Sequence, residues 1–136
     1  MTVVYPEAIV GMFGPLVGMA DEAPFIEKKF RPSIVNESTL KDIYEREIKP
    51  EFLSFDPRIQ SACKVALRYI LNKSDFDYRG EFNSMLMPFR CPDEPRLAFM
   101  WLWDVLYPGE TPLPLDEPFE VKTQVNALWR CILAGD

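Results

Sequence analysis

The run from Leu97 to Tyr107 constrains the fold of this chain most. Ten of its eleven residues are apolar, and Trp101 and Trp103 are among them. A helix that is apolar on every face has to be surrounded by the rest of its domain. We therefore expect a central helix over about residues 94–107, with the other elements packed around it.

The other segments, which prolines separate, show helical rather than alternating periodicity. One amphipathic pattern covers residues 40–48 and is expected to end at Pro50. Another follows Asp56-Pro57, a cap with proline at the first helical position, and carries a continuous stripe from Ile59 to Leu71. A final helix has one apolar face, formed by Val121, Val125, Leu128, Trp129 and Ile132.

These patterns predict an all-α, mostly helical fold. A chain of 136 residues fits one domain, and 48% hydrophobic residues are enough for one core. We expect a compact bundle of about five helices around the central one. Residues 1–23 are predicted to be an irregular apolar arm laid over that core, and residues 108–118 a proline-rich acidic crossover.

The N-terminal sequence favours neither export nor membrane insertion. No Lys or Arg precedes Lys28, so the basic region of a secretory signal is missing. The uncharged run over residues 8–20 contains Gly and Pro and is shorter than the roughly 20 residues of a membrane span. We therefore expect a cytoplasmic protein that does not enter membranes.

Several common chemistries are disfavoured by composition. The chain has no histidine, which is the commonest general base near neutral pH and the commonest metal ligand. Its three cysteines lack CxxC spacing, and Cys63 lies on a predicted buried stripe. No glycine-rich phosphate loop is present. The sequence thus predicts no cofactor, no metal site and no catalytic residues.

The segment from Asp75 to Leu86 resembles part of an EF-hand loop. Asp75, Asp77 and Gly80 stand at positions 1, 3 and 6, but Arg79 and Leu86 replace the ligands of positions 5 and 12. A turn in which Asp75 or Asp77 caps a short helix is the favoured interpretation. A weaker interpretation is that Asp77 and Glu81 act as an acid/base pair.

Asp104 is a lone carboxylate within the apolar run. A buried carboxylate has to pair, shift its pKa or face an opening. Three interpretations stay open: an ion pair with an arginine such as Arg68, Arg79 or Arg130, an exposed place beside a binding cleft, and a catalytic acid. The ion pair is favoured because internal pairs are commoner than active sites.

Acidity is concentrated in the last third of the chain. Residues 1–90 carry 13 acidic and 12 basic side chains, a net charge of −1, whereas residues 91–136 carry 8 and 3, a net charge of −5. Such a field repels nucleic acid and attracts a basic protein surface. Four of the eight acids precede predicted helices, where they favour the helix dipole, so the asymmetry is partly local in origin.

These observations favour a non-catalytic domain that covers a basic surface of a partner protein, as inhibitors and immunity-type proteins do. The crossover, stiffened by its prolines, would present outward-facing carboxylates, although an ordinary surface connection is the competing interpretation. The predicted binding residues are Glu110, Asp116, Glu117, Glu120, Asp104 and Tyr107. The alternatives are a homo-oligomer that uses the arm over residues 1–19 and the run 85–89, and a carboxylate-based enzyme without histidine.

Overall fold

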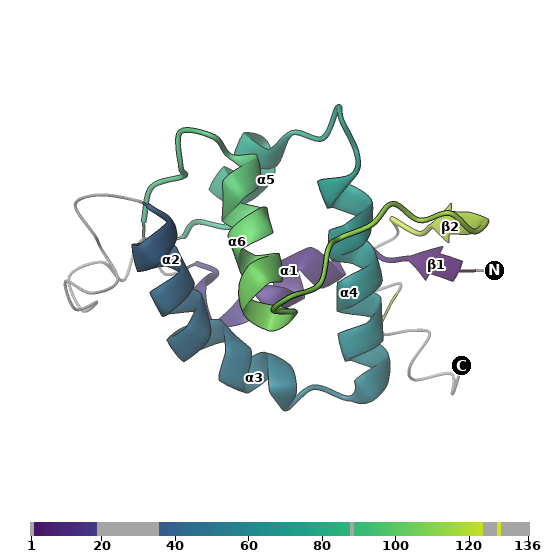
Figure 1. Ribbon diagram of the computed structural model, residues 1–136, viewed down its shortest axis with the longest axis horizontal. Helices are drawn as coiled ribbons and strands as arrows, with labels where there is room; N and C mark the ends of the chain where they lie inside the picture. Colours follow the sequence, from purple (N-terminus) through teal and green to yellow (C-terminus); the bar gives the residue numbers. More distant parts are fainter. Residues whose placement is uncertain (1, 19–35, 88, 124–127, 129–136) are drawn as a thin grey trace.

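The apolar run forms the central helix of the domain. In the computed structural model, which describes residues 2–18, 36–87, 89–123 and 128, helix α6 spans Arg96–Leu106. Its Phe99, Leu102 and Trp103 are buried. Figure 1 shows α6 between α2 (Glu37–Ile43) and α4 (Pro57–Leu71), with α5 (Tyr78–Ser84) beside its first turns. The described residues thus form the expected single, mostly helical domain.

Helix α4 begins with the cap and the first-turn proline that the sequence predicts. The carboxylate of Asp56 accepts a hydrogen bond from the Arg58 N–H at 2.8 Å, and Pro57 occupies the first turn, where no intrahelical N–H is needed. The stripe from Ala62 to Leu71 is buried against α6 and α1. Asp77 caps α5 in the same way, because its carboxylate accepts from the Gly80 N–H at 3.0 Å.

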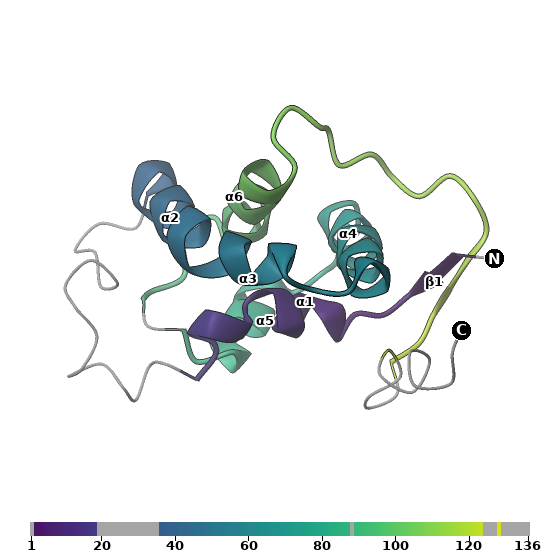
Figure 2. The ribbon, with the colours of Figure 1, turned by 90° about the horizontal axis from the view of Figure 1, so that it is seen from below.

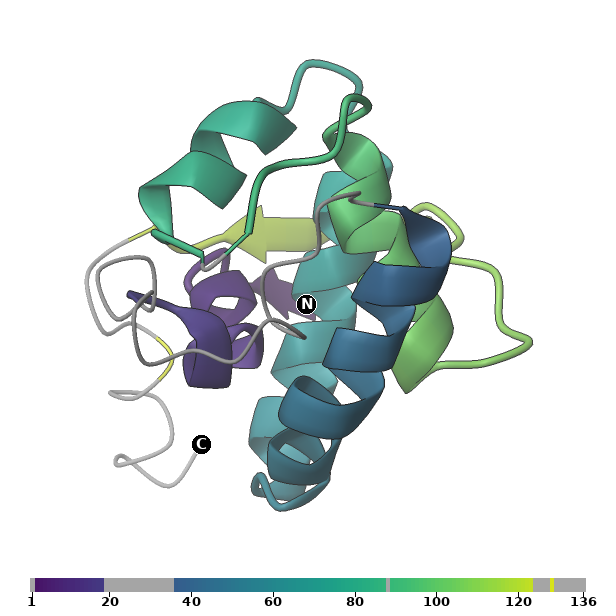
Figure 3. The same ribbon diagram turned by 90° about the vertical axis from the view of Figure 1, so that its left-hand side faces the viewer.

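The expectation that Pro50 ends its helix is wrong. Helix α2 begins with a capping box between Asn36 and Thr39 and continues through a π-helix, η4 (Tyr44–Ile48), into α3 (Lys49–Leu53). Figure 3 shows these three elements as one rod in front of α4. A proline lacks an N–H and collides with the carbonyl four residues earlier, but the wide turn of η4 relieves that conflict and places Pro50 in a first turn.

The N-terminal segment is more regular than the predicted irregular arm. It contains a strand, β1 (Thr2–Val4), a helix, α1 (Ala8–Met12), and a 3-10 turn, η1 (Gly14–Leu16). Ile9, Met12 and Phe13 are buried, so the segment forms one side of the core. A five-residue helix that contains Gly11 is too short to show a sequence pattern, and its packing on α4 decides its formation.

The predicted final helix does not begin at Val121. Residues Phe119–Val121 form strand β2, which pairs in parallel with β1 in the register Thr2 to Phe119 and Val4 to Val121. This pairing joins two segments that are far apart in the chain, so no local pattern predicts it. Leu128 is buried, and the remaining residues of the predicted stripe, Val125, Trp129 and Ile132, lie outside the described residues.

Candidate protein-binding surface

The crossover between α6 and β2 is attached along one side of α4. Lys64, Arg68 and Asn72 are spaced four residues apart and therefore lie on one face of that helix. The Arg68 guanidinium donates to the Leu113 carbonyl at 3.0 Å, and the Asn72 amide donates to the Pro112 carbonyl at 2.8 Å. Figure 2 shows the crossover running from α6 past α4 towards β1.

A second anchor lies at the start of the crossover. The indole N–H of Trp103 donates to the Glu110 carbonyl at 2.8 Å. Lys64 Nζ lies 2.8 Å from the Glu110 carboxylate and 5.0 Å from the centre of the Tyr107 ring. Because these side chains come from α4 and α6, the first part of the crossover is fixed to the two helices that it joins.

This arrangement neutralises one of the carboxylates predicted to face outward. Glu110 is paired with Lys64, so its charge is offset within the domain. The Glu117 carboxylate accepts a weak hydrogen bond from the Thr2 hydroxyl at 3.2 Å. Asp116 and Glu120 are exposed and make no ion pair with any described residue.

Apolar side chains stand beside these acids. Leu113 is 60% exposed and Phe119 is 40% exposed. The Phe119 ring meets Tyr69 of α4 edge-on, with 5.6 Å between ring centres. A hollow of about 180 Å³ lies next to this pair, bounded also by Pro114 and Leu115. We call Leu113, Asp116, Glu117, Phe119 and Glu120 the acidic edge; its apolar members and the hollow carry no signal in the sequence.

Asp104 and Tyr107 lie elsewhere, towards α2 and the core. The Asp104 carboxylate is 3.3 Å from Lys41 Nζ, so it forms an ion pair, with a lysine of α2 rather than with an arginine. The hydrogen bond from Lys41 to Glu37, with a smaller contribution from Asp104, raises the pKa of Lys41. This cluster is partly exposed, and its one lysine and two carboxylates leave a net charge of −1.

Tyr107 is partly buried and packs against the core. Its ring packs against Trp103 and Phe52. Its hydroxyl is buried, and none of the described residues provides it with a hydrogen-bond partner. Burial raises the pKa of this hydroxyl. Asp104 thus pairs with α2, whereas Tyr107 lies beside Lys64, which holds the start of the crossover.

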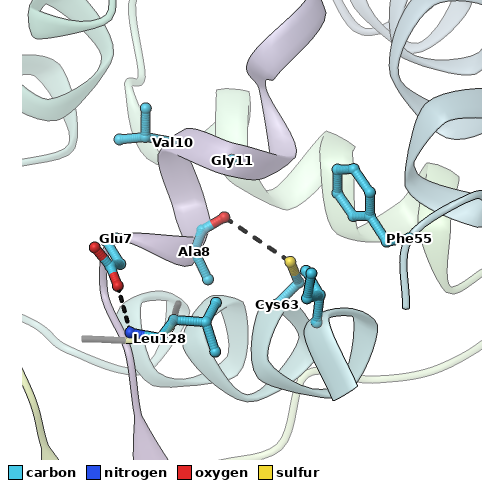
Figure 4. Close-up of a pocket in the computed structure, with 8 residues that line it drawn as sticks. Glu7, Ala8, Val10, Gly11, Phe55, Cys63 and Leu128 are labelled. Carbon is cyan, nitrogen blue, oxygen red and sulfur yellow. Dashed lines mark hydrogen bonds between the residues drawn. The ribbon is translucent and has the colours of Figure 1, made fainter. Parts of the chain in front are cut away.

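Another hollow lies between α1 and α4, and the sequence gives no sign of it. Its volume is about 440 Å³, and Val10, Phe55 and Ile59 supply apolar walls. Figure 4 shows the Cys63 thiol directed at the Ala8 carbonyl, 3.9 Å away, and the Glu7 carboxylate accepting from the Leu128 N–H at 2.6 Å. Burial raises the pKa of the Cys63 thiol to about 12, which makes it a poor nucleophile.

Asp77 and Glu81, the two carboxylates of the weaker acid/base interpretation, interact electrostatically. Asp77 is engaged as the helix cap, while partial burial and the charge of Asp77 raise the pKa of Glu81. The described residues contain no cluster of acidic or cysteine side chains with the geometry of a metal site.

The adhesive surfaces expected for a homo-oligomer are mostly buried. Met85, Met87 and Phe89 are at most 8% exposed, and Leu86 alone among the described residues of that run projects outward. In the N-terminal segment Ile9, Met12 and Phe13 face the core as well. Both runs therefore owe their apolar character to the interior of the domain.

None of the described helices is long and apolar enough to cross a membrane.

Comparison with known proteins identified no related protein. The chain matches no known protein family, and no curated protein or solved structure shows significant similarity to it.

Proposed function

We propose that this chain is a non-catalytic binding domain of the inhibitor or immunity type, which covers a basic surface of a partner protein with its acidic edge. In this proposal Asp116, Glu117 and Glu120 attract the partner, and Leu113 and Phe119 are buried on contact. Charges of this kind accelerate encounter and select the partner, while a few buried apolar side chains hold the complex.

The exposure of Asp116 and Glu120 without ion-pair partners among the described residues carries this proposal. Some acids elsewhere are paired, as Glu37 is with Lys41. Glu51, Asp93 and Glu94 are exposed and form no ion pair with a described residue either, so the apolar side chains next to Asp116 and Glu120 are what distinguish these two acids. Carboxylates that remain unpaired beside an apolar side chain are available to cations on another molecule. Glu110, Asp104 and Tyr107 are left out of the proposed contact.

The attachment of the crossover supports the same role. Arg68, Asn72 and Trp103 hold its backbone, so the acidic edge begins from a fixed position. A surface that is ordered before binding loses less conformational entropy when the partner arrives. The free, buried thiols of Cys63 and Cys91 are consistent with a reducing compartment, and we include a cytoplasmic location in the proposal.

Affinity capture with matched charge variants tests the proposal. The wild-type protein, the triple variant Asp116→Lys/Glu117→Lys/Glu120→Lys and the control Glu51→Lys/Asp93→Lys/Glu94→Lys would be immobilised separately. Both triple variants change the net charge equally, and all six positions are exposed. A basic partner should be captured by the wild type and by the control, and the partner once purified should bind more weakly as salt rises.

Two results would contradict the proposal. One is a purified partner that binds the acidic-edge variant as tightly as it binds the wild type. The other is an affinity that does not change with salt concentration, because contacts between exposed charges are screened by salt. Circular dichroism of each variant would establish that its helices are intact before binding is measured.

A further inference from the structure

We propose that the outer edge of β2 receives an extended segment of the partner as an additional strand, and that this segment alternates basic and apolar residues. This inference rests on the proposed function and names the form of the partner. It concerns the backbone of Phe119 and Val121 as well as the charges beside them.

Among the described residues, only one edge of β2 has backbone hydrogen-bond partners. The Thr2 N–H donates to the Pro118 carbonyl at 3.4 Å, and the Lys122 N–H donates to the Val4 carbonyl at 2.9 Å. In a parallel ladder alternate residues face the same neighbour, so Pro118, Glu120 and Lys122 turn their backbone groups towards β1.

Phe119 and Val121 consequently direct their N–H and C=O groups to the other side of β2. No backbone hydrogen bond reaches these four groups from any described residue. The strand is also near solvent, since Phe119 and Glu120 are exposed. Figure 1 shows β1 and β2 projecting together at the margin of the molecule, beyond α4. Such an edge is a template for another extended chain.

The charges beside β2 determine whether its outer edge favours a second copy of this chain or a segment of another protein. If two copies paired through β2, their Asp116, Glu117 and Glu120 side chains would gather in one place, and like charges across a strand pair are destabilising. A segment that carries Lys or Arg would instead meet opposite charge. The acids therefore oppose self-association through this edge and favour a cationic strand.

The two faces of β2 define the pattern of that strand. Successive side chains of a strand point to opposite faces, so Phe119 and Val121 share one face. Glu120 has the other face, which it shares with Lys122 just beyond the end of β2. The Phe119 face lies against Tyr69 and the hollow of about 180 Å³, which suits an apolar side chain. An incoming strand should thus place apolar residues on this face and basic residues beside Glu120.

Synthetic peptides provide a direct probe. An acetylated, amidated heptapeptide of alternating lysine and valine would be titrated into the full chain. The control is a peptide of the same composition in which all the lysines precede all the valines. The alternating peptide should bind at least tenfold more tightly. It should slow hydrogen exchange at the Phe119 and Val121 amides, which face outward, and leave the inward-facing Glu120 amide unchanged. Equal binding by the two peptides would overturn the proposal.

Variants separate the strand contact from the charge contact. Val121→Pro removes one outward N–H and keeps the inner ladder, so it should weaken the alternating peptide at least tenfold. Val121→Ala keeps that N–H and should retain binding. Glu120→Lys should also weaken binding, whereas Glu51→Lys, which makes the same charge change on α3, should not.

The outcomes also distinguish this inference from the proposed function. If Val121→Pro binds the alternating peptide as tightly as Val121→Ala does, while Glu120→Lys binds it weakly, the edge attracts cations but does not add a strand. That result overturns only the inference. If Glu120→Lys binds the peptide and the captured partner as the wild type does, the proposed function falls as well. Should Val121→Pro fail to fold, the exchange pattern of the wild-type amides decides the question.

Discussion

Tyr44 gives a prediction in which the effect of a single hydroxyl on stability changes sign with pH. Its side chain is fully buried, and its hydroxyl donates to the Ala98 carbonyl at 3.0 Å, which ties η4 to α6. Tyr44→Phe removes one neutral hydrogen bond, and the Ala98 carbonyl keeps its place in the ladder of α6. The expected loss at pH 7 is therefore about 1 kcal/mol of unfolding free energy.

The loss should reverse in alkaline solution. Burial raises the pKa of Tyr44 above its ordinary value of 10.0, so the folded protein holds the proton that the unfolded chain releases. The resulting stability is complete below pH 10 and falls by about 1.4 kcal/mol for each pH unit above it, until the folded pKa is reached. Because the phenylalanine of the variant cannot ionise, the two stability curves should cross between about pH 10.5 and 11.

Urea unfolding followed by tryptophan fluorescence between pH 7 and 11.5 would measure this crossing, since Trp101 and Trp103 are buried. Ile43→Val is the matched control. It lies in the same buried rod, should cost about 1 kcal/mol and carries no titrating group. Its stability difference from the wild type should stay constant with pH. A constant difference for Tyr44→Phe would refute the argument.

Three further predictions concern single side chains. Asp104→Asn should lower the unfolding free energy in urea by less than about 1 kcal/mol, because the ion pair with Lys41 is half-exposed, and a loss above about 3 kcal/mol would show that the pair is effectively buried. Leu86→Gly should raise the melting temperature, because Leu86 has a φ of 51°, a left-handed conformation that costs other residues roughly 1 kcal/mol. Cys63 should resist iodoacetamide in the folded protein at pH 8 and react once urea unfolds it, as peptide mass mapping would show; rapid alkylation of the native protein would contradict the burial of its thiol.

Sequence features within a few residues, such as caps and apolar runs, predicted α4, α5 and α6. Asp56-Pro57 predicted the start of α4, and the side chain of Asp77 was one of two candidates for the cap of α5. The apolar run predicted α6 as the centre. The predicted helix end at Pro50 was wrong, because a π turn before Pro50 relieves its steric conflict and no local sequence pattern predicts that turn. The five-residue helix α1 lacked a recognisable period for a similar reason.

The candidate site was less accessible to prediction. Its acids were identified from the sequence, but whether a given carboxylate is free depends on which cations the fold brings near. Lys64 lies 46 positions from Glu110 in the chain and neutralises it, while Asp116 and Glu120 receive no such partner among the described residues. The exposure of Phe119 likewise depends on its position beside Tyr69.

Periodicity, caps and composition act within a few residues, so the amino-acid order was enough to predict the helical class, the central helix and the acidic, proline-rich character of the crossover. Long-range contacts in the folded domain set the parallel pairing of β1 with β2, the attachment of the crossover along α4 and the division of the acids into paired and unpaired groups. Each of these depends on contacts between residues far apart in the chain, and their free energies appear only when the whole domain has folded.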